Sequence, residues 1–137
     1  MSEHERSRTV AAPPEDVFAQ AGDLGQIDAW LPRDLHVRRE DPPAVTVHDD
    51  STGRDAPALL KARPDQLRLE WSTRDGGSYA GWLQVEGIDG GASSVTVHLS
   101  FLDEGHAPPD NEVTVALDES LDRLAEQVRV RADRSGR

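Results

Sequence analysis

The stretch NEVTVALDESLDRLAEQVRV, residues 111–130, decides the fold of this chain. Its apolar residues recur every three or four positions, which is the period of one face of an α-helix. The other face is charged, so we expect a helix of about 20 residues that lies on a sheet with one side in water. A strand at Glu112–Ala116, with a helix starting near Asp118, is the competing interpretation. The apolar stripe consists of Val113, Leu117, Leu121, Leu124 and Val128.

Between residues 35 and 103 the period of the sequence changes to two, which is typical of β-strands. Leu67, Leu69 and Trp71 share one face of an alternating run, and a second run alternates from Val95 to Phe101. Short turns rich in Gly and Pro separate the runs, which predicts an antiparallel meander. The predicted strands cover residues 35–39, 44–48, 58–62, 67–71, 79–86 and 95–101.

The N-terminal segment predicts a polar first strand within residues 4–12 and then two short helices. The first helix spans about 14–21, because Pro suits a first helical turn and Gly22 ends the pattern. For the second helix, Asp23 is the expected N-cap, Pro32 ends it, and one face is apolar. The buried residues predicted for the two helices are Val17, Phe18 and Ala21, and then Ile27, Trp30 and Leu31.

Composition sets limits on partners and location. The chain has 137 residues, a net charge of −11, 30% charged residues and no cysteine. This acidity disfavours nucleic acid and anionic membranes, and the lack of cysteine excludes disulfides and thiolate chemistry. No apolar run is long enough to cross a membrane, and the charged start of the chain does not resemble a secretion signal. We expect one domain over residues 1–137, ordered over about 4–132, that is cytoplasmic and a monomer or homodimer.

The sequence contains no catalytic or metal-binding signature. None of its five histidines is paired at i, i+4, and no G-x-S-x-G motif occurs. We therefore predict no metal and no cofactor, and we interpret His48-Asp49-Asp50 as a solvated turn. His98 alternates with core residues and is expected to point outward unless a bulge reverses its direction. Arg6 and Arg8 are candidates for holding a ligand carboxylate if the first strand turns them inward.

Four local segments together resemble a known superfamily. They are Ala12–Phe18, Asp28–Pro32, Arg63–Trp71 and Leu117–Val128. In this order they are similar to the strand-to-helix entry, second short helix, mid-sheet strand and C-terminal helix of the START-like (SRPBCC) superfamily. That superfamily includes polyketide cyclase-like proteins, pollen allergens and lipid-transfer domains. The resemblance covers about residues 4–132 and implies an α+β helix-grip fold: a curved antiparallel sheet of six or seven strands around a long C-terminal helix.

The same resemblance implies a small hydrophobic or amphipathic ligand, lipid- or polyketide-like, between the sheet and the helix. Aromatic side chains are the best markers of such a site, since they pack against an apolar ligand and those of Trp and Tyr also form hydrogen bonds. The residues predicted to line the site are Phe18, Trp30, Leu69, Trp71, Tyr79, Phe101, Leu117, Leu121 and Leu124.

Three functions remain open at this point. The first is a binding protein without chemistry. The second is a cyclase- or dehydratase-type enzyme that shapes a reactive chain in the cavity, with Arg6, Arg8, Tyr79 or His98 as candidate polar groups. The third is an interaction protein with a filled core and no ligand.

Overall fold

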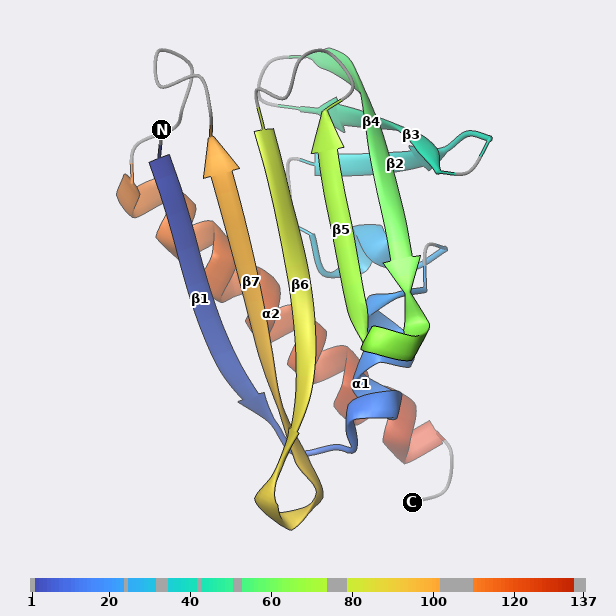
Figure 1. Ribbon diagram of the computed structural model, residues 1–137, viewed down its shortest axis with the longest axis vertical. Coiled ribbons are helices and arrows are strands. Elements are labelled where there is room, and N and C mark those ends of the chain that lie inside the picture. The colour runs from blue at the N-terminus through green and yellow to red at the C-terminus, as the bar shows by residue number, and fades with distance from the viewer. Residues whose placement is uncertain are drawn as a thin grey trace.

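The computed structural model describes residues 2–23, 25–31, 35–41, 43–50, 53–73, 79–101 and 110–134. Seven strands form one antiparallel sheet in the order β1-β7-β6-β5-β4-β3-β2, and the long helix α2 crosses one face of it (Figure 1). This is an α+β helix-grip architecture. The strands are β1 (Ser2–Val10), β2 (Leu35–Arg39), β3 (Ala44–Asp49), β4 (Arg54–Arg63), β5 (Arg68–Thr73), β6 (Tyr79–Ile88) and β7 (Ala92–Phe101).

Helix α2 spans Asp110–Arg134, so the predicted C-terminal helix is confirmed and the alternative strand at Glu112–Ala116 is wrong. All five residues of the apolar stripe are buried, each at most 5% exposed. The helix packs chiefly against β1 and the first helix, because its stripe faces the sheet while its charged residues face water.

All six predicted strands of the meander are present, most of them longer than predicted, and the starts of β4 and β5 differ for identifiable reasons. β4 begins at Arg54 rather than at residue 58, because residues 54–57 pair with the second half of β3. β5 begins at Arg68, because Leu67 has a φ of 53° and ends the 3-10 turn η2 (Pro64–Gln66). Backbone pairing decides both boundaries, and the side-chain pattern does not report it.

The first short helix, α1 (Pro14–Ala21), has the predicted bounds and buries Val17, Phe18 and Ala21. The second predicted short helix is present as a single 3-10 turn, η1 (Ile27–Ala29), so it is shorter than the apolar spacing of Ile27, Trp30 and Leu31 suggests. Asp23 does not cap it. Its carboxylate accepts a hydrogen bond from the Gly25 N–H at 3.0 Å and shapes the preceding turn instead.

The two faces of the sheet differ in character. Alternate residues of β7 are buried from Ser93 to Leu99 and face the helices, and those between them face outward and are partly exposed. The pairing of β6 with β7 is continuous from residue 79 to residue 101, with no bulge. The core therefore lies between one face of the sheet and the layer formed by α1, η1 and α2 (Figure 1). Two further strands of the sheet contribute Leu69, Leu83 and Val85 to it.

Candidate ligand site between the sheet and helix α2

Three of the predicted site residues lie on the helix-facing surface of the sheet. Leu69 is fully buried opposite Leu83 on the neighbouring strand. Trp71 and Phe101 lie near the ends of β5 and β7, and both are partly buried against the core. These two side chains are the large aromatic groups on this face that are neither fully buried nor fully exposed in the described part of the sheet.

The three predicted residues of α2 face the same core. Leu117, Leu121 and Leu124 are 1–3% exposed and succeed one another along the helix stripe. Their spacing places them on one side of the helix, over the sheet. Together with the sheet residues they form the apolar core between the sheet and α2.

Trp30 follows η1 and is 2% exposed. Side chains of α2 hold this segment: Arg123 Nη2 donates to the carbonyl of Leu31 at 2.6 Å, and Gln127 Nε2 donates to that of Ala29 at 2.6 Å. The buried indole N–H of Trp30, however, has no acceptor among the described residues. Burying such a donor without a partner costs about 1–3 kcal/mol. This unpaired donor is a feature that apolar periodicity alone does not predict.

Two predicted site residues stand apart from this group. Phe18 is buried on α1, which packs against α2 and the hairpin end of β6 and β7, the end of the sheet opposite Phe101 (Figure 1). It closes that end of the core. Tyr79 begins β6, and its backbone pairs with Phe101, but its side chain lies outside the described residues.

Arg6 and Arg8 point to the helix side of β1, as the hypothesis that they bind a ligand carboxylate requires. They lie, however, where β1 contacts α2. Arg6 forms a two-pronged ion pair with Asp118, with contacts of 2.9 and 3.1 Å, and Arg8 pairs with Asp122. Asp118 raises the pKa of Arg6 through these hydrogen bonds. The two pairs line a groove of about 310 Å³ that has Leu121 in its wall. Both arginines therefore already hold a carboxylate.

His98 points outward, as the alternation predicts, because no bulge interrupts its strand. Its ring stacks on Trp82 with centroids 5.2 Å apart, and Glu5 lies 3.1 Å from its Nδ1. On the other neighbouring strand, the guanidinium of Arg68 lies 4.7 Å from the centre of the Trp82 ring and bonds Glu70 at 2.8 Å. This outer row is remote from the helix-facing surface, so neither His98 nor Trp82 belongs to the candidate site.

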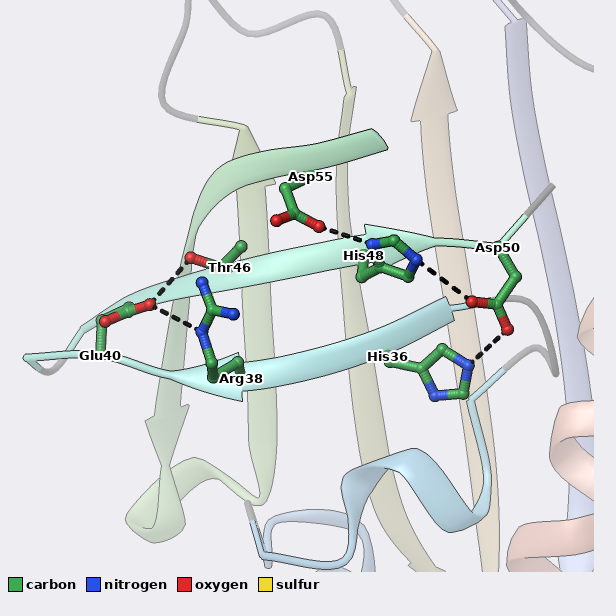
Figure 2. Close-up of polar contacts among 7 residues, drawn as sticks. All are labelled: His36, Arg38, Glu40, Thr46, His48, Asp50 and Asp55. Carbon is green, nitrogen blue, oxygen red and sulfur yellow. Dashed lines mark hydrogen bonds and ion pairs between the residues drawn. The ribbon is translucent and has the colours of Figure 1, made fainter. Parts of the chain in front are cut away.

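A second polar cluster joins β2, β3 and β4 on the outer face, and sequence reasoning missed it. His36 and His48 are directly opposite each other across the β2–β3 pair, and both rings point at Asp50 (Figure 2). His36 Nε2 lies 2.8 Å from one oxygen of Asp50, and His48 Nε2 lies 3.3 Å from the other. The hydrogen bond to Asp50 is the main cause that raises the pKa of His36. Pairing the two predicted strands as a hairpin would have brought these histidines together.

The other nitrogen of each ring also faces a carboxylate. His48 Nδ1 lies 2.6 Å from Asp55 of β4, and His36 Nδ1 lies 3.5 Å from Asp28 of η1. Despite this concentration of ligating side chains, no group of three in the described residues is arranged to hold a metal ion. Within the same residues, no helix is long and apolar enough to cross a membrane.

Comparison with protein families gives one match. The model of a family described as "Polyketide cyclase / dehydrase and lipid transport" matches residues 1–129, nearly the whole chain. The chain belongs to this family. Membership agrees with the resemblance read from the sequence and with the helix-grip fold. No curated protein matches this member of the family closely enough to be compared with it.

Solved structures of low sequence identity share the fold of this polyketide cyclase family member. An uncharacterised Bacillus thuringiensis protein aligns with a TM-score of 0.71 at 16% identity, covering 93% of this chain and 98% of that one. The ZhuI aromatase/cyclase from Streptomyces sp. R1128 aligns at 0.66 and 17% identity, covering 99% and 96%. The di-domain ARO/CYC StfQ from the steffimycin biosynthetic pathway aligns at 0.73 and 17% identity, covering 96% of this chain and 47% of its own.

Proposed function

We propose that this protein binds an amphipathic small molecule, with an apolar body and a hydrogen-bond-accepting oxygen, between the helix-facing surface of the sheet and α2. The unpaired buried indole N–H of Trp30 is the observation that carries the proposal. Family membership supports it, since the family is described by polyketide cyclisation and lipid transport. The apolar body would lie among Leu69, Trp71, Phe101, Leu117, Leu121 and Leu124, with Tyr79 and Phe18 at the margins.

The energetic argument concerns the cost of that unpaired donor. A ligand oxygen that accepts from Trp30 Nε1 removes a penalty of about 1–3 kcal/mol that the free protein carries. An analogue of the same shape without the oxygen leaves the penalty in place. A site with a buried donor therefore distinguishes the two ligands more sharply than an apolar site does.

Two probes of matched shape test this. 2-Acetylnaphthalene carries a carbonyl oxygen, and 2-ethylnaphthalene has a methylene in its place. We expect the ketone to bind the native protein about tenfold more tightly, which corresponds to roughly 1.4 kcal/mol. Dissociation constants from equilibrium dialysis give this ratio for the native protein, for Trp30→Phe and for Trp82→Phe. Trp82→Phe is the control, because Trp82 stacks on the outer face.

The two variants have opposite expected results. Trp30→Phe should bring the ratio close to one while retaining affinity for the hydrocarbon, and Trp82→Phe should keep the native ratio. Absence of binding by either probe, or an unchanged ratio in Trp30→Phe, refutes the proposal. A circular dichroism spectrum of each variant shows that the comparison is made between folded proteins.

An enzymatic role has less support among the described side chains. Arg6 and Arg8 are occupied by aspartates at the β1–α2 seam, and His98 is on the outer face. A role as a ligand-free interaction protein has little support as well. The two exposed large apolar residues in the described chain, Ile88 and Val115, belong to the end of β6 and the start of α2, at opposite ends of the fold (Figure 1).

A further inference from the structure

The cluster of His36 and His48 contains more carboxylates than two neutral rings can satisfy. Each of the four ring nitrogens faces a carboxylate oxygen, at distances of 2.6–3.5 Å. A neutral imidazole has one N–H and one lone pair. With both rings neutral, two of the four contacts would set a lone pair against a carboxylate oxygen. The contacts of His36 Nε2 with Asp50 at 2.8 Å and of His48 Nδ1 with Asp55 at 2.6 Å are hydrogen bonds that neutral rings can also donate. Protonation of His36 would make its Nδ1, 3.5 Å from Asp28, a donor as well, and so would turn that contact into an attractive one.

The three carboxylates that contact the two rings come from different parts of the fold. Asp28 belongs to η1, Asp50 follows β3, and Asp55 belongs to β4. Figure 2 also shows Arg38 and Glu40 at the other end of β2. These two residues pair with each other, with Arg38 Nε 3.2 Å from a carboxylate oxygen of Glu40. Among the described residues, therefore, three carboxylates surround the rings.

Asp28 connects the cluster to the candidate ligand site. One of its oxygens accepts the backbone N–H of Val37 on β2 at 2.8 Å, and the other faces His36 Nδ1. Trp30 follows Asp28 by two residues, so the carboxylate that contacts the cluster and the indole that would contact the ligand lie in one short segment. A charged His36 binds Asp28 more strongly than a neutral one does, because a charge-assisted hydrogen bond is the stronger kind.

We propose that protonation of His36 regulates ligand affinity by fixing η1, and Trp30 with it, against the sheet. This inference rests on the proposed function, since it concerns the same ligand site. A charged His36 holds η1 through Asp28 and the residue after β3 through Asp50. When His36 is neutral, its contact with Asp28 is weaker, while the hydrogen bond from the Val37 N–H to Asp28 remains. Ordering Trp30 then costs more on binding, so ligand affinity is lower.

The direction of the pH dependence follows from linkage. The pKa of His36 in the folded protein is raised above its ordinary value, about 6.5. The contribution of the charged ring is therefore fully present below about pH 6.5 and is lost as pH rises through the raised pKa. Ligand affinity should fall across the same interval.

The experiment measures the dissociation constant of 2-acetylnaphthalene, which has no ionisable group, at about pH 6 and about pH 8.5 in buffer containing EDTA. We expect the native affinity to fall about fivefold over this interval, the lower end of typical coupling between linked sites. The double variant His36→Gln/His48→Gln should bind equally at both pH values. The control His98→Gln, which removes a histidine of the outer row, should retain the native pH dependence.

The outcomes separate this inference from the proposed function. Binding that is equal at both pH values in the native protein, or a pH dependence that persists in the double variant, overturns the inference and leaves the proposed function intact. If the probe does not bind at all, the proposed function fails. Hydrogen exchange of the Val37 amide then tests directly the hydrogen bond between Val37 of β2 and Asp28 of η1. After correction for the intrinsic exchange rate, the protection of this amide should fall as pH rises in the native protein but not in the double variant. An equal fall in protection in both proteins refutes the inference.

Discussion

The indole of Trp71 on β5 packs directly onto the bare backbone of Gly81, its partner on β6. A methyl group built on Gly81 would lie 2.5 Å from Trp71 Nε1 and 2.6 Å from the carbonyl oxygen of His98. Real Cβ atoms do not approach other atoms so closely. The absence of a side chain at position 81 therefore leaves room for the Trp71 indole, a residue proposed for the ligand site, on the helix-facing surface of the sheet.

We predict that Gly81→Ala destabilises the protein by about 1–3 kcal/mol, the usual cost of overpacking a core. One of the two clashing atoms belongs to the backbone of β7 and cannot turn aside. Urea denaturation followed by circular dichroism measures the change. Gly25→Ala is the matched control, because its nearest neighbour is a carboxylate oxygen 3.4 Å away in an exposed turn. Equal stability of the two variants would contradict this account of position 81.

Periodicity predicted most of this fold. The stripe of α2 and the alternation of β7 are present in the structure as predicted, because one apolar face is enough to specify which side of an element is buried. The short segment at Ile27–Ala29 was predicted less well. Its i, i+3 spacing fits both an α-helix and a 3-10 turn, and contacts from Arg123 and Gln127, about 90 residues away, hold it in place.

The candidate site was predictable in its apolar part only. Burial of Trp30 and Leu124 follows from hydrophobic patterning, but the missing acceptor of Trp30 depends on what surrounds its ring in three dimensions. The destinations of Arg6 and Arg8 likewise depend on the register between β1 and α2, which no local pattern encodes. His36 and His48 lie 12 residues apart, and strand pairing, rather than sequence spacing, makes them neighbours.

Leu124→Ala should cost about 2–5 kcal/mol of stability, the range for a fully buried leucine whose removal leaves a cavity. Leu124 belongs to the stripe and is 1% exposed. Val115→Ala, on the same helix but 54% exposed, should change stability by no more than about 0.5 kcal/mol. Thermal and urea unfolding of the two variants compare these effects. A small cost at position 124 would mean that the stripe does not pack as described.

Glu70 should make stability depend on pH in the acid range. Hydrogen bonds from Arg63 and then Arg68, each at 2.8 Å, lower the pKa of its carboxyl group. A lowered pKa stabilises the fold above the unfolded value, about 4.3, and this contribution is lost as pH falls through the folded value. The stability difference between native protein and Glu70→Gln should thus be positive near pH 7 and decrease as pH falls through the lowered pKa.

Urea midpoints of native protein and Glu70→Gln across this interval test the sign. Glu86→Gln, an exposed carboxyl on β6, is measured alongside as a control for the loss of one negative charge from a chain with a net charge of −11. A difference at position 70 that grows as pH falls would show that the two arginines do not stabilise the ionised form.

Arg123 should contribute to ligand affinity without contacting the ligand. Its guanidinium donates to the carbonyl of Leu31, directly after Trp30, and so fixes the segment that carries the unpaired indole N–H. Arg123→Met keeps most of the apolar stem but removes the donor, and we expect 2-acetylnaphthalene to bind about three- to tenfold more weakly. This loss corresponds to about one hydrogen bond. Arg129→Met is the matched control, because the Arg129 guanidinium pairs with Glu126 on the exposed side of the same helix. Equilibrium dialysis measures the affinity of both variants for 2-acetylnaphthalene. Equal affinities would mean that Trp30 keeps its position without the hydrogen bond from Arg123 to Leu31.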